Sequence, residues 1–222
     1  KITIAAVKMW SLRSNYFVWD FSVDLVQKLI EKSNGRIIGA ASYNPFNIAE
    51  SLKEIEKAVK EYHFKFVYFH TMSFGLAPND KRYYPLYAKC NELKIPVSVQ
   101  VGHSAEPMPS ALGNPMYMDE IAITFPDLKI NLSHTGWPWF REWCDLVWKH
   151  PNVYGDISAY MPKSLEPYQI QFMFSGRGNK KVMWGTNGIG LGRGKKELME
   201  MEGKEEGKRN ILRDNAIRFL GL

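Results

Sequence analysis

The sequence predicts an α/β fold with a parallel sheet, closed into a TIM-like (β/α) barrel, and three observations support this. Short runs rich in apolar and β-branched residues alternate with segments of helical period. The strand-like runs are nearly continuous in apolar character, which is typical of strands covered by helices. Seven such β-then-α units follow one another within 222 residues.

The strand-like runs are bounded by turn residues, glycine or charged residues. They span 2–9, 36–43, 64–70, 95–103, 128–136, 152–158 and 180–187. The helix-like segments repeat apolar residues every three or four positions, as Leu52, Ile55 and Val59 do in the second one. They span 21–35, 47–62, 80–94, 115–126, 139–150, 165–175 and 208–222. Strict alternation requires helical crossovers, and these make neighbouring strands parallel.

Two architectures fit this alternation. An open doubly wound sheet needs a point where the strand order reverses. A closed barrel needs eight units, so seven units with a closing helix indicate a barrel whose first strand is missing from this sequence or supplied irregularly. The barrel is favoured, as a single domain over 1–222, with the charged stretch 192–208 as a solvated connection.

Composition narrows the function classes. The formal charge is +6, but 29 Lys and Arg are interspersed with 23 Asp and Glu, so no nucleic-acid partner is expected. No apolar run reaches the roughly 18 residues of a membrane span, and the first ten residues do not resemble a signal peptide. We therefore expect a cytoplasmic protein with a small-molecule substrate and no membrane contact. Cys90 and Cys144 lie in apolar periodic segments and are expected to be buried thiols.

Polar residues close several of the predicted strands, where an α/β barrel carries its active site. The candidates are His70, Gln100, His103, His134 and Asn187. Because a barrel brings strand ends within reach of one ligand, together they indicate a site more strongly than any one does. Asp156 either joins this site or caps the turn that follows its strand.

Three further features have two interpretations each. The glycine-rich segment 185–194 is either a flexible connector or an anion clamp that uses Arg193 and the lysines after it. Trp137 either packs in the core or walls a pocket for a flat ring. The Pro- and Gly-rich loop 104–115 is typical of a lid or an interface arm.

Four segments together resemble the amidohydrolase-2 family. They are "PNDKRYYPLYAKCNELKIPVSVQVGH", "INLSHTGWPWFREWCDLVWKHPNVYGDISAY", "KVMWGTN" and "ILRDNAIRFLGL". The resemblance runs from about Arg36 to Leu222. It implies a distorted (β/α)8 barrel and either hydrolysis of small ring or carboxylated compounds or loss of CO2 from them. It also implies, in most members, one divalent metal, often zinc.

The resemblance also marks departures from the family pattern. The His-x-His pair of the family's first strand is absent, Gln100 stands where the family has a histidine ligand, and Asn187 stands where it has an aspartate. His134 keeps the type of the family's acid/base histidine. An amide is a poor zinc ligand and no general base, so zinc is expected here only if an upstream first strand supplies ligands.

Two hypotheses follow. In the first, the chain is a hydrolase or decarboxylase: His134 and Asn187 are catalytic, and His70, Gln100, His103, Trp137 and Arg193 bind substrate. In the second, it is a non-catalytic barrel that serves as a binding or structural subunit. In either case, a barrel without its first strand has two exposed edges, so we expect a homo-oligomer.

Overall fold

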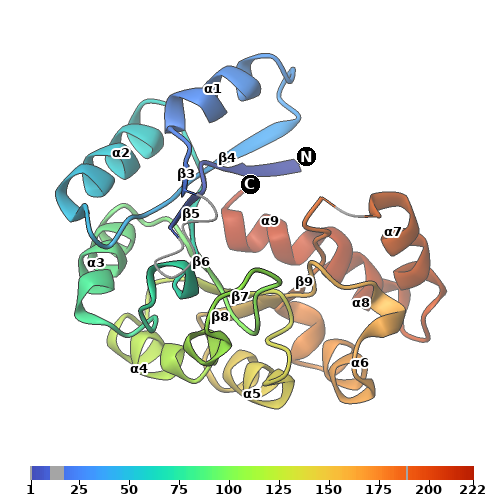
Figure 1. Cartoon of the computed structure of the whole chain (residues 1–222). Coiled ribbons are helices and arrows are strands. Elements are labelled where there is room, and N and C mark those ends of the chain that lie inside the picture. The colour runs from blue at the N-terminus through green and yellow to red at the C-terminus, as the bar shows by residue number, and fades with distance from the viewer. Residues whose placement is uncertain (1, 11–17, 189) are drawn as a thin grey trace.

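The computed structural model describes residues 2–10, 18–188 and 190–222. Seven strands form one parallel sheet in the order β1-β4-β5-β6-β7-β8-β9, curled into a partial barrel with helices around it (Figure 1). The sheet order follows the chain order with no reversal, which excludes the doubly wound alternative. The strands are β1 (Ile2–Ala5), β4 (Ile37–Ala41), β5 (Phe66–Phe69), β6 (Val97–Gln100), β7 (Ile130–Ser133), β8 (Val153–Asp156) and β9 (Val182–Met183).

Except for α7 and α8, the helices lie within segments that the apolar period predicts. They are α1 (Val23–Glu31), α2 (Ile48–Lys60), α3 (Tyr84–Glu92), α4 (Tyr117–Thr124), α5 (Phe140–Lys149), α6 (Pro167–Met173), α7 (Leu191–Glu200), α8 (Glu205–Arg209) and α9 (Asn215–Leu220). Trp143 of α5 donates its Nε1–H to the Leu132 carbonyl at 2.9 Å. A Cβ at Gly155 would lie 2.1 Å from that indole, so glycine is required for this close packing. Both cysteines are buried free thiols, as predicted.

Two segments differ from the prediction. The run 2–9 divides: β1 ends at Ala5, and β2 (Lys8–Trp10) pairs antiparallel with β3 (Val18–Asp20). The stretch 192–208, predicted as a solvated connection, is largely helical and partly buried. Arg193 and Glu197 are joined across one turn of α7, and Leu198 is buried. Ion pairs between charged residues on one face of α7, and burial of apolar residues on the other face, stabilise this helix although it contains glycines.

The last helix lies at the N-terminal ends of the strands. The Lys129 ammonium donates to the Arg218 carbonyl at 2.6 Å, and the rings of Tyr154 and Phe219 are 5.3 Å apart. A pocket of about 710 Å³ separates α9 from the segments that precede β5, β6 and β7. This pocket is therefore at the opposite end of the sheet from the predicted site.

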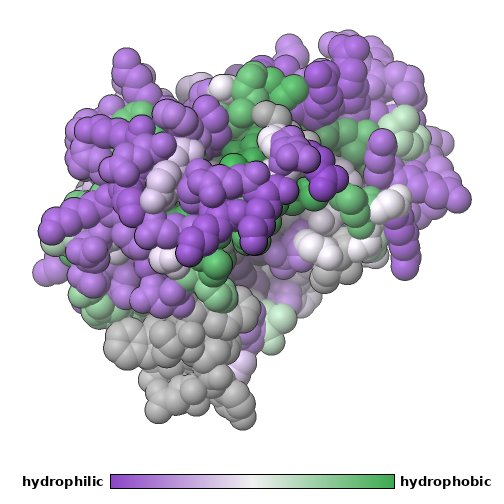
Figure 2. Space-filling view, turned by 90° about the horizontal axis from the view of Figure 1, so that it is seen from above, coloured by the Kyte–Doolittle hydropathy of each residue, from purple (hydrophilic) through white to green (hydrophobic). Residues whose placement is uncertain are grey.

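The first and last strands of the sheet, β1 and β9, are relevant to the predicted homo-oligomer. Exposed apolar side chains occur on β1 and α1, namely Ile2, Leu25 and Leu29. Figure 2 shows a largely hydrophilic face with a band of hydrophobic surface across it. The homo-oligomer stays a prediction. Within the described residues, no helix is both long and apolar enough to cross a membrane.

Candidate functional site

Most of the predicted site residues, with Ser158 as a neighbour, fall into two groups. One group is buried or half-buried at the C-terminal ends of β5 to β8. We call it the strand-end cluster: His70, Gln100, His134, Asp156 and Ser158. The other group follows β9 and is exposed: Asn187 and Arg193.

The alternation of side chains along each strand explains how the cluster forms. Val97 and Val99 of β6 lie in the apolar core, so Ser98 and Gln100 point to the opposite, inner face of the sheet. In β7 the same alternation turns Asn131 inward, where its amide donates to Ser98 Oγ at 2.8 Å and to Asp156 Oδ2 at 2.6 Å. One side chain thus links three neighbouring strands.

Asp156 is the acceptor at the centre of the cluster. Besides Asn131, the backbone N–H groups of Ser158 and His134 donate to Oδ1 at 2.9 and 3.2 Å, and the Ser158 hydroxyl also donates to it. An ionised carboxylate is an acceptor without a proton to give, so it matches this set of donors. Of the two roles considered for Asp156, the structure supports the turn cap and also connects Asp156 to the cluster.

The same contacts determine the protonation of His134. Its Nδ1 lies 2.5 Å from Ser158 Oγ, and because the Ser158 proton goes to Asp156, Oγ must accept from an Nδ1–H. The Nε2 lone pair is then free. Burial lowers the pKa of His134, and the charge of Asp156 opposes the shift without cancelling it. His134 is therefore neutral near pH 7, with a basic nitrogen available.

The backbone around His134 is unusual. His134 and Thr135 have φ values of 72° and 60°, in the left-handed region that such residues rarely adopt. Thr135 is held from both sides: its N–H donates to the Asp156 carbonyl at 3.0 Å, and the Gln169 amide donates to its carbonyl at 2.8 Å. Backbone strain of this kind concentrates at functional sites.

His70 is fixed in the opposite tautomer. Its Nδ1 accepts the backbone N–H of Ser73 at 3.2 Å, while the Ser73 hydroxyl donates to the His70 carbonyl at 2.7 Å. The proton must therefore be on Nε2, which is buried and has no hydrogen-bond partner among the residues that the structure describes. Burial lowers the pKa of His70 from 6.5 to about 4.

Two members of the site are absent from the sequence prediction. Tyr68 donates its hydroxyl to Gln100 Oε1 at 2.6 Å. It lies two residues before His70 on the same face of β5, and this spacing could have identified it. Glu106, from the loop after β6, is close enough for its charge to act on His70, His134 and Tyr68. The sequence of that loop has no regular spacing of apolar or polar residues, so it could not have identified Glu106 as a site residue.

His103 and Trp137 lie beside the cluster. The His103 ring contacts the Trp137 ring edge-on at 4.8 Å, and its Nε2 is 2.8 Å from the Tyr160 hydroxyl. Trp137 is 43% exposed, so it is not part of the core. The pair joins the loop after β6 to the segment after β7.

Asn187 and Arg193 have other surroundings. Asn187 and Gly188 form a left-handed turn, with φ values of 50° and 80°. Arg193 donates to Glu197 Oε1 at 2.7 Å on the surface of α7. Among the described residues no hydrogen bond connects either side chain to the strand-end cluster. Gly185 does approach it, since a Cβ there would lie 2.9 Å from the Ser158 Cβ.

The donor set does not fit the zinc site that the family resemblance implies. Over 2–10, 18–188 and 190–222, no three His, Cys, Asp or Glu side chains are grouped so that they could hold a metal ion. Gln100 Oε1 already accepts from Tyr68. We therefore assign no step to a metal.

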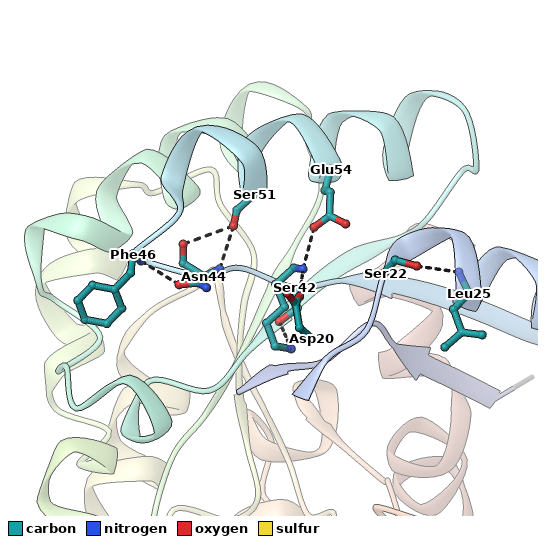
Figure 3. A network of polar contacts seen from close by, with 9 residues as sticks. Asp20, Ser22, Leu25, Ser42, Asn44, Phe46, Ser51 and Glu54 are labelled. Carbon is teal, nitrogen blue, oxygen red and sulfur yellow. Dashed lines mark hydrogen bonds and ion pairs between the residues drawn. The ribbon is translucent and has the colours of Figure 1, made fainter. Parts of the chain in front are cut away.

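A second polar cluster lies where β1 and β4 end, and Figure 3 shows its surroundings. The buried Lys8 ammonium contacts Asp20 at 2.5 Å and Glu54 at 2.9 Å. Burial alone would lower the pKa of Lys8, but these two hydrogen bonds outweigh burial and raise it. Because two carboxylates hold the Lys8 ammonium, we assign this cluster a structural role: it ties the β2–β3 pair to α2.

The curled parallel sheet, with polar side chains at its C-terminal strand ends, defines a protein of the TIM-barrel fold. More narrowly, the chain belongs to the amidohydrolase family, whose sequence model matches residues 18–222. A comparison with curated proteins found no match.

Solved structures confirm the barrel fold. An uncharacterised TIM-barrel protein from Bordetella bronchiseptica has a TM-score of 0.81 and 23% identity, over 98% of this chain and 76% of its own. The 5-carboxyvanillate decarboxylase of Sphingomonas paucimobilis has a TM-score of 0.71 and 14% identity, over 90% and 71%. The 4-oxalomesaconate hydratase of Rhodopseudomonas palustris has a TM-score of 0.66 and 21% identity, over 89% and 70%.

Proposed function

We propose that the strand-end cluster is the active site of a hydrolase- or decarboxylase-type enzyme, in which His134 transfers a proton to or from a small carboxylated or cyclic substrate. The supporting observation is the chain from Asp156 through Ser158 to His134, which leaves Nε2 as a free base. An oriented, neutral histidine in a half-buried site is well suited to general-base chemistry near neutral pH.

The tautomer gives the order of the proton steps. Nε2 first removes a proton from water as the oxygen attacks a carbonyl carbon or an activated double bond. In hydrolysis the same nitrogen then returns the proton to the leaving group, and in hydration it gives the proton to the carbon of the double bond that water did not attack. Decarboxylation would need Nε2 protonated at the start, which the lowered pKa of His134 disfavours. Hydrolysis or hydration is therefore the preferred reaction, with decarboxylation second.

The substrate class is argued from the neighbours and from the site. Similar folds include decarboxylases of 5-carboxyvanillate and 2,6-dihydroxybenzoate and a hydratase of 4-oxalomesaconate, all with carboxylated substrates. In this chain His70, Gln100 and Tyr68 offer polar groups beside His134, and Trp137 offers a flat apolar wall.

The test is turnover with small carboxylated compounds and a lactone. Purified protein and His134→Asn are incubated with 5-carboxyvanillate, 2,6-dihydroxybenzoate, 4-oxalomesaconate and a γ-lactone, and products are followed by chromatography and mass. We expect turnover in the wild type and its loss in the variant. Equal turnover in both would exclude the role of His134, and no turnover in the wild type would favour the non-catalytic barrel.

The oligomer is proposed with the enzyme. The exposed apolar side chains of β1 and α1 support association of two or more copies. Light scattering after size exclusion, compared with the 25.6 kDa of one chain, tests it. A monomer at every concentration would exclude it.

A further inference from the structure

The strand-end cluster contains a donor that no residue in the described part of the chain uses. His70 is 1% exposed, its Nε2–H has no hydrogen-bond partner among the described residues, and its orientation is locked by Ser73 on the other ring nitrogen. A buried donor left unpaired costs about 1–3 kcal/mol. Such a group is explained when a ligand atom completes it.

The loop over this donor is anchored at its base. The Gly102 N–H donates to the Gly113 carbonyl at 2.7 Å, and the His103 N–H donates to the Trp137 carbonyl at 2.8 Å. The ten residues 103–112 between these glycines form a compact loop of the Ω type. Its end, Ser110–Gly113, packs against Met72–Phe74, the turn that immediately follows His70.

Glu106 is the anionic group that this loop contributes. Its carboxylate accepts from the Ser104 hydroxyl, and its charge acts on both His70 and His134. A carboxylate of the protein therefore lies within electrostatic reach of the unpaired donor. This is the chemistry that a carboxylated substrate would bring.

We propose that His70 Nε2–H receives the carboxylate of the substrate, and that Glu106 on the loop 103–112 occupies the approach to this donor until the substrate displaces it. The inference rests on the proposed function and deepens it. The sequence suggested that Arg193 binds the substrate carboxylate, but Arg193 is exposed and paired with Glu197. In this proposal the buried, neutral His70 binds the carboxylate instead. A fixed donor selects an anion by geometry and does not attract every anion by charge.

The experiment uses benzoate as the probe, followed by calorimetry and by the ¹⁵N–¹H signals of the imidazoles. Three variants separate the groups. His70→Asn keeps an acceptor near Nδ1 for the Ser73 N–H but removes the Nε2–H. His70→Gln keeps a donor near Nε2. Glu106→Gln removes the competing charge while keeping the shape of the side chain.

We expect saturable benzoate binding in the wild type, with a downfield shift of the His70 Nε2–H signal. Asn at position 70 should weaken binding at least about tenfold, the value of one hydrogen bond to a charged group, and Gln should restore most of it. Glu106→Gln should bind benzoate more tightly, at least about threefold.

Several outcomes would overturn the proposal. The first is that the wild type does not bind benzoate, and the second is that His70→Asn binds benzoate as tightly as the wild type does. The third is that His70→Gln loses as much benzoate affinity as His70→Asn, and the fourth is that Glu106→Gln does not bind benzoate more tightly than the wild type. His134→Asn separates this proposal from the proposed function, because it should lose turnover while still binding benzoate. Benzoate binding without turnover in the wild type would leave this proposal standing and remove the proposed function.

Discussion

The ends of β5 to β8 and the segment after β9 carry similar polar signals in the sequence, but their structural roles differ. At the ends of β5 to β8 the polar side chains are buried and hydrogen-bonded across strands, from Ser98 through Asn131 to Asp156. After β9, Asn187 is exposed in a left-handed turn and Arg193 lies on a helix surface.

The difference has a geometric origin. β6, β7 and β8 have four residues each, so alternation directs several side chains inward before the strand ends. β9 has two residues, Val182 and Met183, and its register with β8 ends at Asp156. The chain beyond it is positioned by its own turns and not by the sheet, so a polar residue there is not constrained to face the site.

The sharpest test of this contrast compares His134→Asn with Asn187→Ala. Asn at position 134 keeps a donor near Nδ1 for Ser158 but removes the Nε2 base. We expect kcat/KM to fall about 10²–10⁴-fold, the range for loss of a general acid/base. Asn187→Ala should change it less than about threefold, as is typical of an exposed residue outside the cluster. Steady-state kinetics on the best substrate measures both. Equal losses would place Asn187 in the catalytic machinery.

Asp156→Asn tests the stability of the buried network. The carboxylate of Asp156 accepts hydrogen bonds from several buried donors. An amide would turn its own NH₂ group toward some of them, and those donors would lose their acceptor. We expect about 3 kcal/mol of destabilisation, measured by urea unfolding. Asp145→Asn is the matched control, an exposed carboxyl on α5, and should change stability by less than about 0.5 kcal/mol. Similar values for the two variants would mean that the cluster does not stabilise the fold.

The fold and part of the cluster were predictable for the same reason. Helical and strand periods are local, and they place His70, Gln100 and His134 at strand ends before any contact is known. Tyr68 follows from the period of β5. No local pattern predicts the position of Glu106, the pairing of β2 with β3 or the start of α7. These features depend on contacts between distant segments, such as the ion pair between Lys8 and Glu54. The contacts of His134 depend on Ser158, which follows β8 and is distant from His134 in the sequence.

The two histidines of the cluster predict a pH dependence that the segment after β9 should not share. The pKa of His70 is lowered from 6.5 to about 4 by burial, so between these values the unfolded chain binds a proton that the folded chain does not. Stability should therefore rise with pH in this window and be lost as pH falls, by up to about 1.4 kcal/mol per unit.

The measurement is urea unfolding from pH 4.5 to 7 in the wild type and in His70→Asn. The difference between the two slopes isolates His70 from the carboxylates, which titrate in both proteins. His63→Asn is the control, since His63 is exposed and should leave the slope unchanged. A slope in His70→Asn identical to that of the wild type would mean that His70 charges freely in the folded protein.

Arg193→Ala tests the surface side of the comparison and should have the smallest effect. The Arg193 side chain is 73% exposed, and solvent screens its ion pair with Glu197. We expect the Tm to change by less than about 2 °C and benzoate affinity to stay within about twofold. Lys196→Ala is the matched control, since it removes a similar exposed charge that lies near Glu200 on the same helix. If Arg193→Ala alone weakened benzoate binding about tenfold or more, the glycine-rich segment would be an anion clamp, and carboxylate recognition would return from His70 to α7.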